Sequence, residues 1–340
     1  MKRLRLEFAE PGRVQVVEEP VSQPEALQVL VEVDYSAISP GTEMLVYRGQ
    51  WPEELSRDSS IAALSGDFSY PVSYGYACVG RVIAVGEEVS DQWLDRRVYG
   101  FQPHQSHFCA EVDVLQPIPE DIDDHTALFL ASMETGVNLL LDGCPLIGEL
   151  VIVFGQGIIG LLTTALLARF PLAGLITVDS SANRRLASKQ YGAVESYAPH
   201  DDDLMQAFGA VAGQGGKADL VYELSGNPDA LSTALTLTRF SGRVIIGSWY
   251  GSKSVELNLG SFYHRGRVKL VSSQVSTLAP ELTGRWDKAR RLQLAWDMLR
   301  LIKPAGLISQ TFSLGEASQA YELIDQSPEQ TIQVIFDYRP

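Results

Sequence analysis

Hydrophobic and polar positions alternate in short runs through the first third of the chain. Residues 1–8 alternate polar and apolar side chains, as a half-exposed strand does. Further strands are predicted at residues 28–34, 80–86 and 95–100, separated by proline and glycine. The pattern predicts a mainly β segment from residue 1 to about residue 119, arranged as a partly closed barrel.

The pattern changes near residue 123, after which predicted helices and strands alternate. This alternation is typical of a parallel, doubly wound sheet, so the predicted fold class is α/β. The last predicted strand, at residues 332–337, is expected to return to the first domain, because a chain with one inserted domain must complete its starting sheet. The predicted helices are 126–140, 184–191, 229–237 and 286–302, and the earlier strands are 150–154, 175–179, 219–225, 242–247 and 269–274.

Two polar segments interrupt these patterns. Residues 51–68 carry Pro52, Gly66 and mixed charge, and they predict a loop with a short helix that could serve as a lid. The acidic run at residues 201–203 predicts a solvated loop or a helix start.

The stretch from residue 150 to residue 179 predicts a strand, a glycine turn, a helix and a second strand. Gly155 permits a tight turn, Gly157 lets the backbone approach a pyrophosphate, and Gly160 lets helix and strand pack closely. The amides that open the helix, at Ile158 and Ile159, are expected to receive the phosphates.

Asp179 ends the second strand of this stretch, where a carboxylate can accept hydrogen bonds from the adenosine ribose. The same carboxylate would repel a 2′-phosphate. The sequence therefore predicts a bound dinucleotide and favours NAD(H), with NADP(H) less favoured.

Other interpretations of this stretch are a glycine turn in an unrelated parallel sheet and a methyltransferase site. A membrane helix is a third, since residues 150–168 carry no charge over nearly the length that spans a bilayer. Gly155, Gly157 and Gly160 interrupt that run and nothing beside it resembles a membrane anchor, so we exclude a membrane span.

Length and composition narrow the function classes. A chain of 340 residues exceeds the usual size of a single core, so two domains are expected. The formal net charge of −15 argues against nucleic acid or an anionic membrane as partner, because both require clustered basic residues. The three cysteines include no CxxC pair, and no signal peptide is visible, which predicts a reduced, cytoplasmic setting.

Several motifs together resemble one family over essentially the whole chain. They are Ala37-Ile-Ser-Pro-Gly-Thr-Glu43, Gly75-Tyr-Ala-Cys-Val-Gly80-Arg-Val, Asp95-Arg-Arg-Val, the glycine turn and Ala320-Tyr-Glu-Leu. The chain resembles the medium-chain dehydrogenase/reductase superfamily, the zinc alcohol dehydrogenase-like proteins. The resemblance implies a GroES-like catalytic domain that brackets a Rossmann domain, with a small-molecule substrate in the cleft between them, and a homodimer joined at the edges of the Rossmann sheets. On this basis residues 1–134 form the first part of the catalytic domain, 135–273 the Rossmann domain, and 274–340 the return to the catalytic domain.

The chain departs from the zinc-binding members at each metal ligand. Pro40, Tyr76 and Ala131 stand at the three positions where the resemblance implies ligands to catalytic zinc. Proline and alanine offer no donor atom, and one tyrosine does not hold zinc. The lobe of four closely spaced cysteines that binds structural zinc is also missing. We therefore expect no metal.

Without a Lewis acid, another group must polarise the reacting oxygen. Thr42 stands where zinc members have a proton-relay hydroxyl, and it is the first candidate. Glu43 stands where they have an acid that orients a ligand, so a Glu43–Tyr76 hydrogen bond is expected, with Tyr76 as an acid or simply as a filler of the vacated volume. His104 and His107 are further candidates for a proton donor.

The resemblance also implies contacts with the cofactor. Thr135 and the backbone at Ser273 are expected beside the nicotinamide, and Arg184 beside the adenine. Arg184 and Arg185 could also accept a 2′-phosphate, which keeps NADP(H) open. The remaining positions are Leu224 and Ser225 near the adenosine ribose, and Ile246 and Ser248 near the nicotinamide ribose or carboxamide.

These features favour a zinc-independent oxidoreductase that moves hydride between NAD(H) and a hydroxyl/carbonyl pair. The motifs resemble the branch with bacteriochlorophyllide dehydrogenases and sugar or secondary-metabolite dehydrogenases, which implies a mid-sized substrate. Two alternatives remain open: a reductase of activated C=C bonds, of the enone or quinone type, and a non-catalytic NAD(H)-binding scaffold or sensor.

Overall fold

The computed structural model describes residues 2–52, 61–66, 68–199 and 216–339. The chain divides into two compact units, Met1–Ala131 with Lys303–Pro340 (unit 1) and Ser132–Ile302 (unit 2). Residues 53–60 and 67 of the predicted lid at 51–68, and the acidic run at 201–203, lie outside the described residues.

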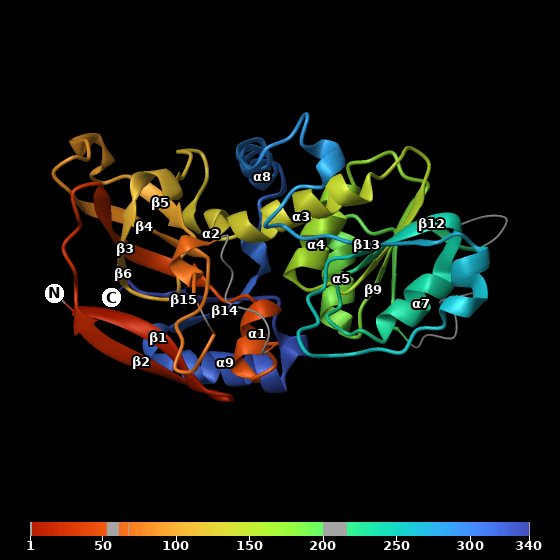
Figure 1. Cartoon of the computed structure of the whole chain (residues 1–340), viewed down its shortest axis with the longest axis horizontal. Helices are drawn as coiled ribbons and strands as arrows, with labels where there is room; N and C mark the ends of the chain where they lie inside the picture. The colour runs from red at the N-terminus through yellow and green to blue at the C-terminus, as the bar shows by residue number, and fades with distance from the viewer. Residues whose placement is uncertain (1, 53–60, 67, 200–215, 340) are drawn as a thin grey trace. The chain divides into compact units, whose positions relative to one another are not determined.

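Unit 1 is built on a mixed sheet with the strand order β14-β15-β3-β4-β5-β7, and β6 also pairs with β3. The central strand β3 pairs antiparallel with β4, β6 and β15, so the predicted closing strand does join the first sheet. Strands β1 and β2 form a separate antiparallel hairpin at the N-terminal end of the chain (Figure 1). The strands are β1 Lys2–Glu10, β2 Arg13–Pro20, β3 Gln28–Ala37, β4 Cys78–Val85, β5 Arg97–Gly100, β6 His107–Glu111, β7 Gln116–Pro117, β14 Ile308–Ser313 and β15 Gln333–Asp337.

The described part of unit 1 also contains the α-helices α1 Thr42–Tyr47, α2 Asp124–Ala127 and α9 Ala317–Gln326. Helix α9 is amphipathic, since Ala317, Ala320, Tyr321 and Ile324 recur on one buried face. That face packs in one hydrophobic core with residues of β1, α1 and β15. The core therefore fixes α1, which carries Thr42, against the C-terminal helix.

Unit 2 is a six-stranded parallel sheet with the order β10-β9-β8-β11-β12-β13. Counted from β8, this is the order 3-2-1-4-5-6 of the doubly wound dinucleotide-binding sheet. Every residue of β8 and β9 is buried, because helices cover both faces of the sheet. The strands are β8 Leu150–Phe154, β9 Gly174–Val178, β10 Glu195–Tyr197, β11 Ala218–Glu223, β12 Thr238–Ile246 and β13 Lys269–Ser272.

Alternate residues of β8 enter two different cores. Leu150, Ile152 and Phe154 pack in the core that includes helix α7, whereas Val151 and Val153 pack with residues of α3 and α4. The helices are α3 Leu130–Gly143, α4 Ile158–Leu167, α5 Ala182–Gln190, α7 Ala230–Leu237 and α8 Lys288–Ile302 (Figure 1). The doubly wound α/β organisation expected from the sequence is present.

The two units differ from the predicted division at their second boundary. The sequence places the return to the first domain at residue 274, whereas residues 274–302 belong to unit 2 in the structure. The reason is α8, whose buried Arg291 is hydrogen-bonded to Glu134 and Asn138 of α3. A contact between distant segments, which leaves no periodic signal, therefore keeps α8 with the parallel sheet.

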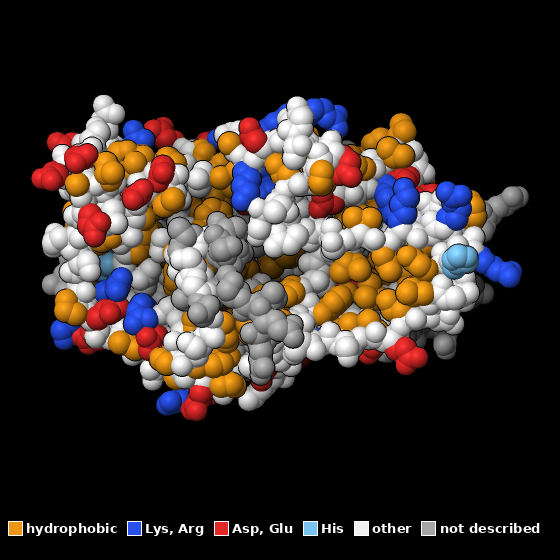
Figure 2. All heavy atoms as spheres, viewed as in Figure 1, with side chains coloured by type: hydrophobic (Ala, Val, Ile, Leu, Met, Phe, Trp, Pro, Cys, Tyr) orange, Lys and Arg blue, Asp and Glu red, His pale blue; other side chains and the backbone are white. Residues whose placement is uncertain are grey.

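The surface carries charges of both signs. On the face seen in Figure 2, acidic and basic side chains intersperse over unit 1, and a larger hydrophobic area lies over unit 2. Among the described residues, no helix is long and apolar enough to cross a membrane.

Candidate functional site

The glycine turn after β8 has the geometry that its sequence predicts. Gly155 has φ +83°, and a Cβ there would lie 2.5 Å from the carbonyl oxygen of Leu224. A Cβ at Gly160 would lie 1.9 Å from the carbonyl oxygen of Gly155. Both positions therefore admit only glycine, one for backbone conformation and both for close packing.

Gly157 is different, because packing within the protein does not require it. A Cβ at this position would meet no atom within 4 Å. Gly157 is the N-cap of α4, and no side chain caps that helix end. Its first-turn amides can thus receive an anion, and the open space at Gly157 lets a phosphate approach them.

Asp179 directly follows β9 and is 7% exposed. Its Oδ2 accepts a hydrogen bond from the Gln156 amide at 2.6 Å, and its Oδ1 accepts one from the Ser181 amide at 2.7 Å. The fully buried Gln156 side chain donates to the Gly155 carbonyl at 3.0 Å and accepts from Thr164 of α4 at 3.0 Å. The acid is thus tied to the glycine turn, beside the position where a ribose is expected.

The other predicted cofactor residues lie at the carboxyl ends of the parallel strands. Close approach of Gly155 to Leu224 and Ser225 brings the turns after β8 and β11 together. The strand order reverses between these two strands, and ligands of such sheets bind at this point. Ile246 ends β12, its carbonyl accepts from the Ser273 amide at 2.9 Å, and Ser248 Oγ accepts from the Gly226 amide at 2.9 Å.

The arrangement within unit 2 therefore fits a dinucleotide. Its strand ends, uncapped helix start and buried acid are the features by which doubly wound sheets hold phosphates and an adenosine ribose. Thr135 lies on α3 and Arg184 in the first turn of α5, both partly exposed. Their contacts with the cofactor stay predictions.

Sequence reasoning missed a buried acid at the end of β11. Glu223 is fully buried and accepts hydrogen bonds from the Ser225 amide at 2.8 Å and from the hydroxyls of Ser225 and Tyr250. Burial raises the pKa of the Tyr250 hydroxyl, and the neighbouring Glu223 carboxylate raises it further. The available signal was a single acid in the otherwise apolar end of a predicted strand.

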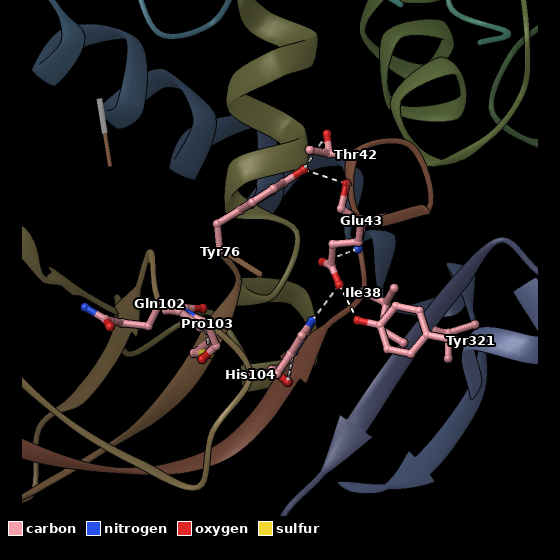
Figure 3. A network of polar contacts seen from close by, with 12 residues as sticks. Ile38, Thr42, Glu43, Tyr76, Gln102, Pro103, His104 and Tyr321 are labelled. Carbon is pink, nitrogen blue, oxygen red and sulfur yellow. Dashed lines mark hydrogen bonds and ion pairs between the residues drawn. The ribbon is translucent and has the colours of Figure 1, made fainter. Parts of the chain in front are cut away.

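In unit 1, three hydroxyl groups gather at the turn before α1 (Figure 3). Tyr76 Oη donates to Ser39 Oγ at 2.5 Å and lies 3.5 Å from Thr42 Oγ1. Two of these residues were predicted, and Ser39 was not, although it stands in the same Ser-Pro-Gly-Thr motif. All three residues are partly exposed.

The predicted Glu43–Tyr76 hydrogen bond is wrong. Glu43 is fully buried and accepts from His104 Nε2 at 2.9 Å, Tyr321 Oη at 2.5 Å and the Ser39 amide at 2.8 Å (Figure 3). The reason is that α1 begins at Thr42, so consecutive side chains point in different directions around the helix. Thr42 stays near Tyr76, whereas Glu43 enters the core.

His104 also differs from its predicted role as a proton donor to substrate. The side chain is fully buried, and both ring nitrogens are engaged, Nδ1 with Ser36 Oγ at 2.6 Å and Nε2 with Glu43. A Cβ at Gly75 would lie 2.8 Å from the imidazole, so glycine is needed there as well. His104 therefore supports the interior of unit 1. His107 is likewise buried, and burial lowers its pKa.

The side chains at the three expected ligand positions do not fit zinc. Pro40 and Ala131 carry no donor atom, and Tyr76 is engaged with Ser39. Within the described ranges, no cluster of three or more histidine, cysteine or acidic side chains could hold a metal ion.

Comparison with known proteins agrees with this architecture. Residues 159–292 match the family described as zinc-binding dehydrogenase. D-guloside 3-dehydrogenase of Escherichia coli (strain K12) is 25% identical over 328 residues, which cover 91% of this chain and 92% of that protein.

Solved structures of low sequence identity share the fold. RspB from E. coli CFT073, described as a short chain alcohol dehydrogenase complexed with NADH, has a TM-score of 0.79 at 20% identity, covering 99% of both chains. The 2R,3R-butanediol dehydrogenase of Bacillus subtilis has a TM-score of 0.80 at 15% identity, covering 99% of this chain and 100% of that one. The predicted Rossmann and GroES-like fold class is confirmed. These similarities support the predicted resemblance to the medium-chain dehydrogenase/reductase superfamily of alcohol dehydrogenase-like, NAD(P)-dependent oxidoreductases.

Proposed function

We propose that the protein is a zinc-independent, NAD(H)-dependent oxidoreductase that acts on a hydroxyl/carbonyl pair of a mid-sized metabolite. The observation that carries this proposal is the hydroxyl group of Tyr76, which is hydrogen-bonded to Ser39 beside Thr42, at a position where the family resemblance implies a metal ligand. A phenol held by a second hydroxyl can supply the proton that the oxygen of a carbonyl needs as it is reduced.

The preference for NAD(H) rests on Asp179. Two backbone amides hold its carboxylate at the end of β9, next to the glycine turn. A 2′-phosphate there would meet a fixed negative charge, while ribose hydroxyls would find acceptors. Arg185 Nη1 donates to the carbonyls of Asp179 and Ser180, which engages one of the two arginines that could have favoured NADP(H).

In this proposal the protein's own part is to move a proton. A bound nicotinamide supplies or accepts the hydride. During carbonyl reduction, Tyr76 Oη gives its proton to the substrate oxygen as negative charge develops there. The Ser39 hydroxyl then turns to donate to the tyrosinate oxygen, and solvent returns a proton to Tyr76. In alcohol oxidation the steps run in reverse: Tyr76 first loses its proton to solvent, and the resulting tyrosinate accepts the proton of the substrate hydroxyl.

Glu43 fixes the backbone of the turn that carries the Ser39 hydroxyl. Its carboxylate accepts from the Ser39 amide, and His104 and Tyr321 hold the carboxylate in the core. Ser39 therefore sits on a turn whose backbone is fixed, so that its Oγ stays within reach of Tyr76. We assign Glu43 and His104 as positioning residues.

The substrate class is inferred from the relatives. Similarity to D-guloside 3-dehydrogenase over most of both chains supports a secondary hydroxyl on a sugar-like molecule. The motif resemblance to sugar and secondary-metabolite dehydrogenases supports the same size range.

A substrate panel with metal analysis tests the proposal. The purified protein is first analysed for zinc and is then treated with a chelator and assayed with NADH and NADPH against keto-sugars, simple ketones and enones. We expect turnover of keto-sugars with NADH and less than one zinc per ten chains. Turnover of enones alone would identify a C=C reductase, and stoichiometric zinc would overturn the metal-free mechanism. Tight NADH binding without any turnover would favour a sensor or scaffold.

Two tyrosine variants test the role of Tyr76. In Tyr76→Phe we expect kcat to fall by about 10²–10⁴-fold, the usual contribution of a general acid. Tyr70→Phe is the matched control, because Tyr70 donates its hydroxyl proton to the Val46 carbonyl in the same unit. It should leave kcat unchanged. Equal kcat in both variants would remove Tyr76 from the mechanism.

We also propose a homodimer. Strand β13 is the last strand of the described six-stranded sheet, and pairing of two such edges would extend the sheet across a twofold axis. Light scattering during size-exclusion chromatography measures the mass directly, and a monomer mass would refute the dimer.

A further inference from the structure

Arg291 is the centre of a buried polar cluster in unit 2. It lies on α8, is 1% exposed, and uses its whole guanidinium group for hydrogen bonds. Nε and Nη2 donate to Glu134 Oε1 at 3.1 and 2.9 Å, and Nη1 donates to Asn138 Oδ1 at 2.6 Å. Nη2 and Nη1 also donate to the carbonyls of Val275 and Thr277, at 2.6 and 3.1 Å.

The same cluster continues to the end of β13. Asn138 Nδ2 donates to Asp142 Oδ2 at 2.9 Å and to Ser273 Oγ at 3.1 Å. Ser273 Oγ in turn donates to Asp142 Oδ2 at 2.6 Å. Because residues four apart share one face of a helix, Glu134, Asn138 and Asp142 present a single polar stripe of α3 to residues 273–277.

This cluster holds a backbone segment rather than merely joining two helices. Val275 and Thr277 lie in an irregular stretch between β13 and α8, where no ladder of strand hydrogen bonds holds their carbonyls. A planar guanidinium donates in fixed directions, so it sets the position of both carbonyls relative to the Glu134 carboxylate. Burial raises the pKa of Glu134, and Arg291 opposes this shift, as expected for an ion pair shielded from water.

The two segments that this cluster joins, α3 and residues 273–277, are the segments expected around the nicotinamide. Thr135 follows Glu134 directly, and Ser273 is itself a member of the cluster. We propose that Arg291 is a positioning residue for the nicotinamide end of the cofactor site, and that it fixes residues 273–277 against α3 so that the ring has one well-defined place. This rests on the proposed NAD(H)-dependent function.

The experiment compares NADH with ADP-ribose, which has the adenosine, both phosphates and a ribose but lacks the nicotinamide. Dissociation constants for both are measured by calorimetry on wild type and Arg291→Met. We expect Kd for NADH to rise about tenfold and Kd for ADP-ribose to stay within about twofold. Arg291→Lys, which keeps the charge but not the fork, should lie between the two.

Arg243→Met is the matched control. Arg243 is also partly buried in unit 2, pairs with both oxygens of Glu149 and donates to the carbonyls of Gly143 and Cys144. It lies at the amino ends of the strands, the opposite edge from the cofactor turn, because Arg243 pairs with the first residue of β13. This variant should lower thermal stability without changing the ratio of the two dissociation constants.

The outcomes separate the two levels of the proposal. If Arg291→Met weakens NADH and ADP-ribose equally, Arg291 supports the fold alone and the positioning role is refuted. If wild type binds neither ligand, the proposed cofactor function fails instead. Should Arg291→Met not fold, Arg291→Lys and Glu134→Gln carry the same comparison, and an unchanged ratio in both would overturn the inference.

Discussion

Replacement of Glu43 should reveal how strongly the turn that carries Ser39 depends on the buried carboxylate that accepts from its amide. The carboxylate is fully buried and accepts hydrogen bonds from His104, Tyr321 and the Ser39 amide. In Glu43→Ala all three donors lose their acceptor in a site closed to water. In Glu43→Gln the side chain keeps its volume and one acceptor oxygen.

The expected magnitudes follow from the number of groups left unpaired. Each buried donor left without its acceptor costs about 1–3 kcal/mol, and Glu43→Ala leaves three such donors, so we expect a loss of at least roughly 3 kcal/mol. Glutamine can donate to Tyr321, and His104 can change its tautomer to accept from the amide. We therefore expect only about 1–2 kcal/mol for Glu43→Gln.

Hydrogen exchange measured by mass spectrometry is the suitable assay, because it reports local stability in each unit separately. Peptides from β3 and α9 should exchange faster in Glu43→Ala, while peptides from β8 and β11 should keep their wild-type rates. Relative to wild type, kcat should fall less in Glu43→Gln than in Glu43→Ala. Residues 36–42 should likewise exchange more slowly in Glu43→Gln than in Glu43→Ala.

Two results would refute this reasoning. Glu43→Ala with wild-type protection in β3 and α9 would mean that the three hydrogen bonds add little to stability. Equal acceleration in both units would mean that the variant acts on global unfolding and not on the turn that carries Ser39.

Three further predictions follow from local geometry. Gly157→Ala should keep wild-type thermal stability but lose NADH binding, measured by fluorescence titration, because its Cβ would occupy only the open space through which a phosphate approaches the helix. Gly160→Ala should fail to fold stably, since its Cβ would overlap a carbonyl oxygen. Asp179→Ala should reduce the ratio of NADH to NADPH affinity, and an unchanged ratio would mean that this acid does not meet the ribose. Burial lowers the pKa of His107 below its usual 6.5, so the folded state binds fewer protons than the unfolded state and loses stability as pH falls below that value. In His107→Gln that loss should shrink when urea unfolding is measured from pH 7 to 5, whereas the exposed His264→Gln should behave like wild type.

The sequence could predict the parts of the fold that depend on neighbouring residues. The strand, glycine turn and helix from 150 to 167 are consecutive, so their pattern carries both the structure and the reason for each glycine. The alternation of helices and strands likewise predicts the parallel sheet. The side-chain chemistry at Thr42 and Tyr76 required the family resemblance, because isolated threonine and tyrosine residues have no distinctive spacing.

The partners of Glu43 could not be predicted in this way. His104 lies 61 positions from Glu43 and Tyr321 lies 278 positions from it, and no periodicity links them. Arg291 joins residues 134 and 138 across a similar separation. Such contacts depend on how sheets and helices close into a core, which a single sequence does not encode locally.

The position of Glu43 explains how an acid can persist where the expected metal ligands are absent. A fully buried carboxylate without a cation nearby is strongly disfavoured, so it must have hydrogen-bond donors. In this chain an imidazole, a phenol and a backbone amide supply them, and the amide belongs to the serine that holds Tyr76. The acid therefore contributes to the site through the backbone of Ser39. Restoring ligands at positions 40, 76 and 131 would leave this arrangement in place, and a new histidine at position 76 would find the Glu43 carboxylate already occupied by His104 and Tyr321.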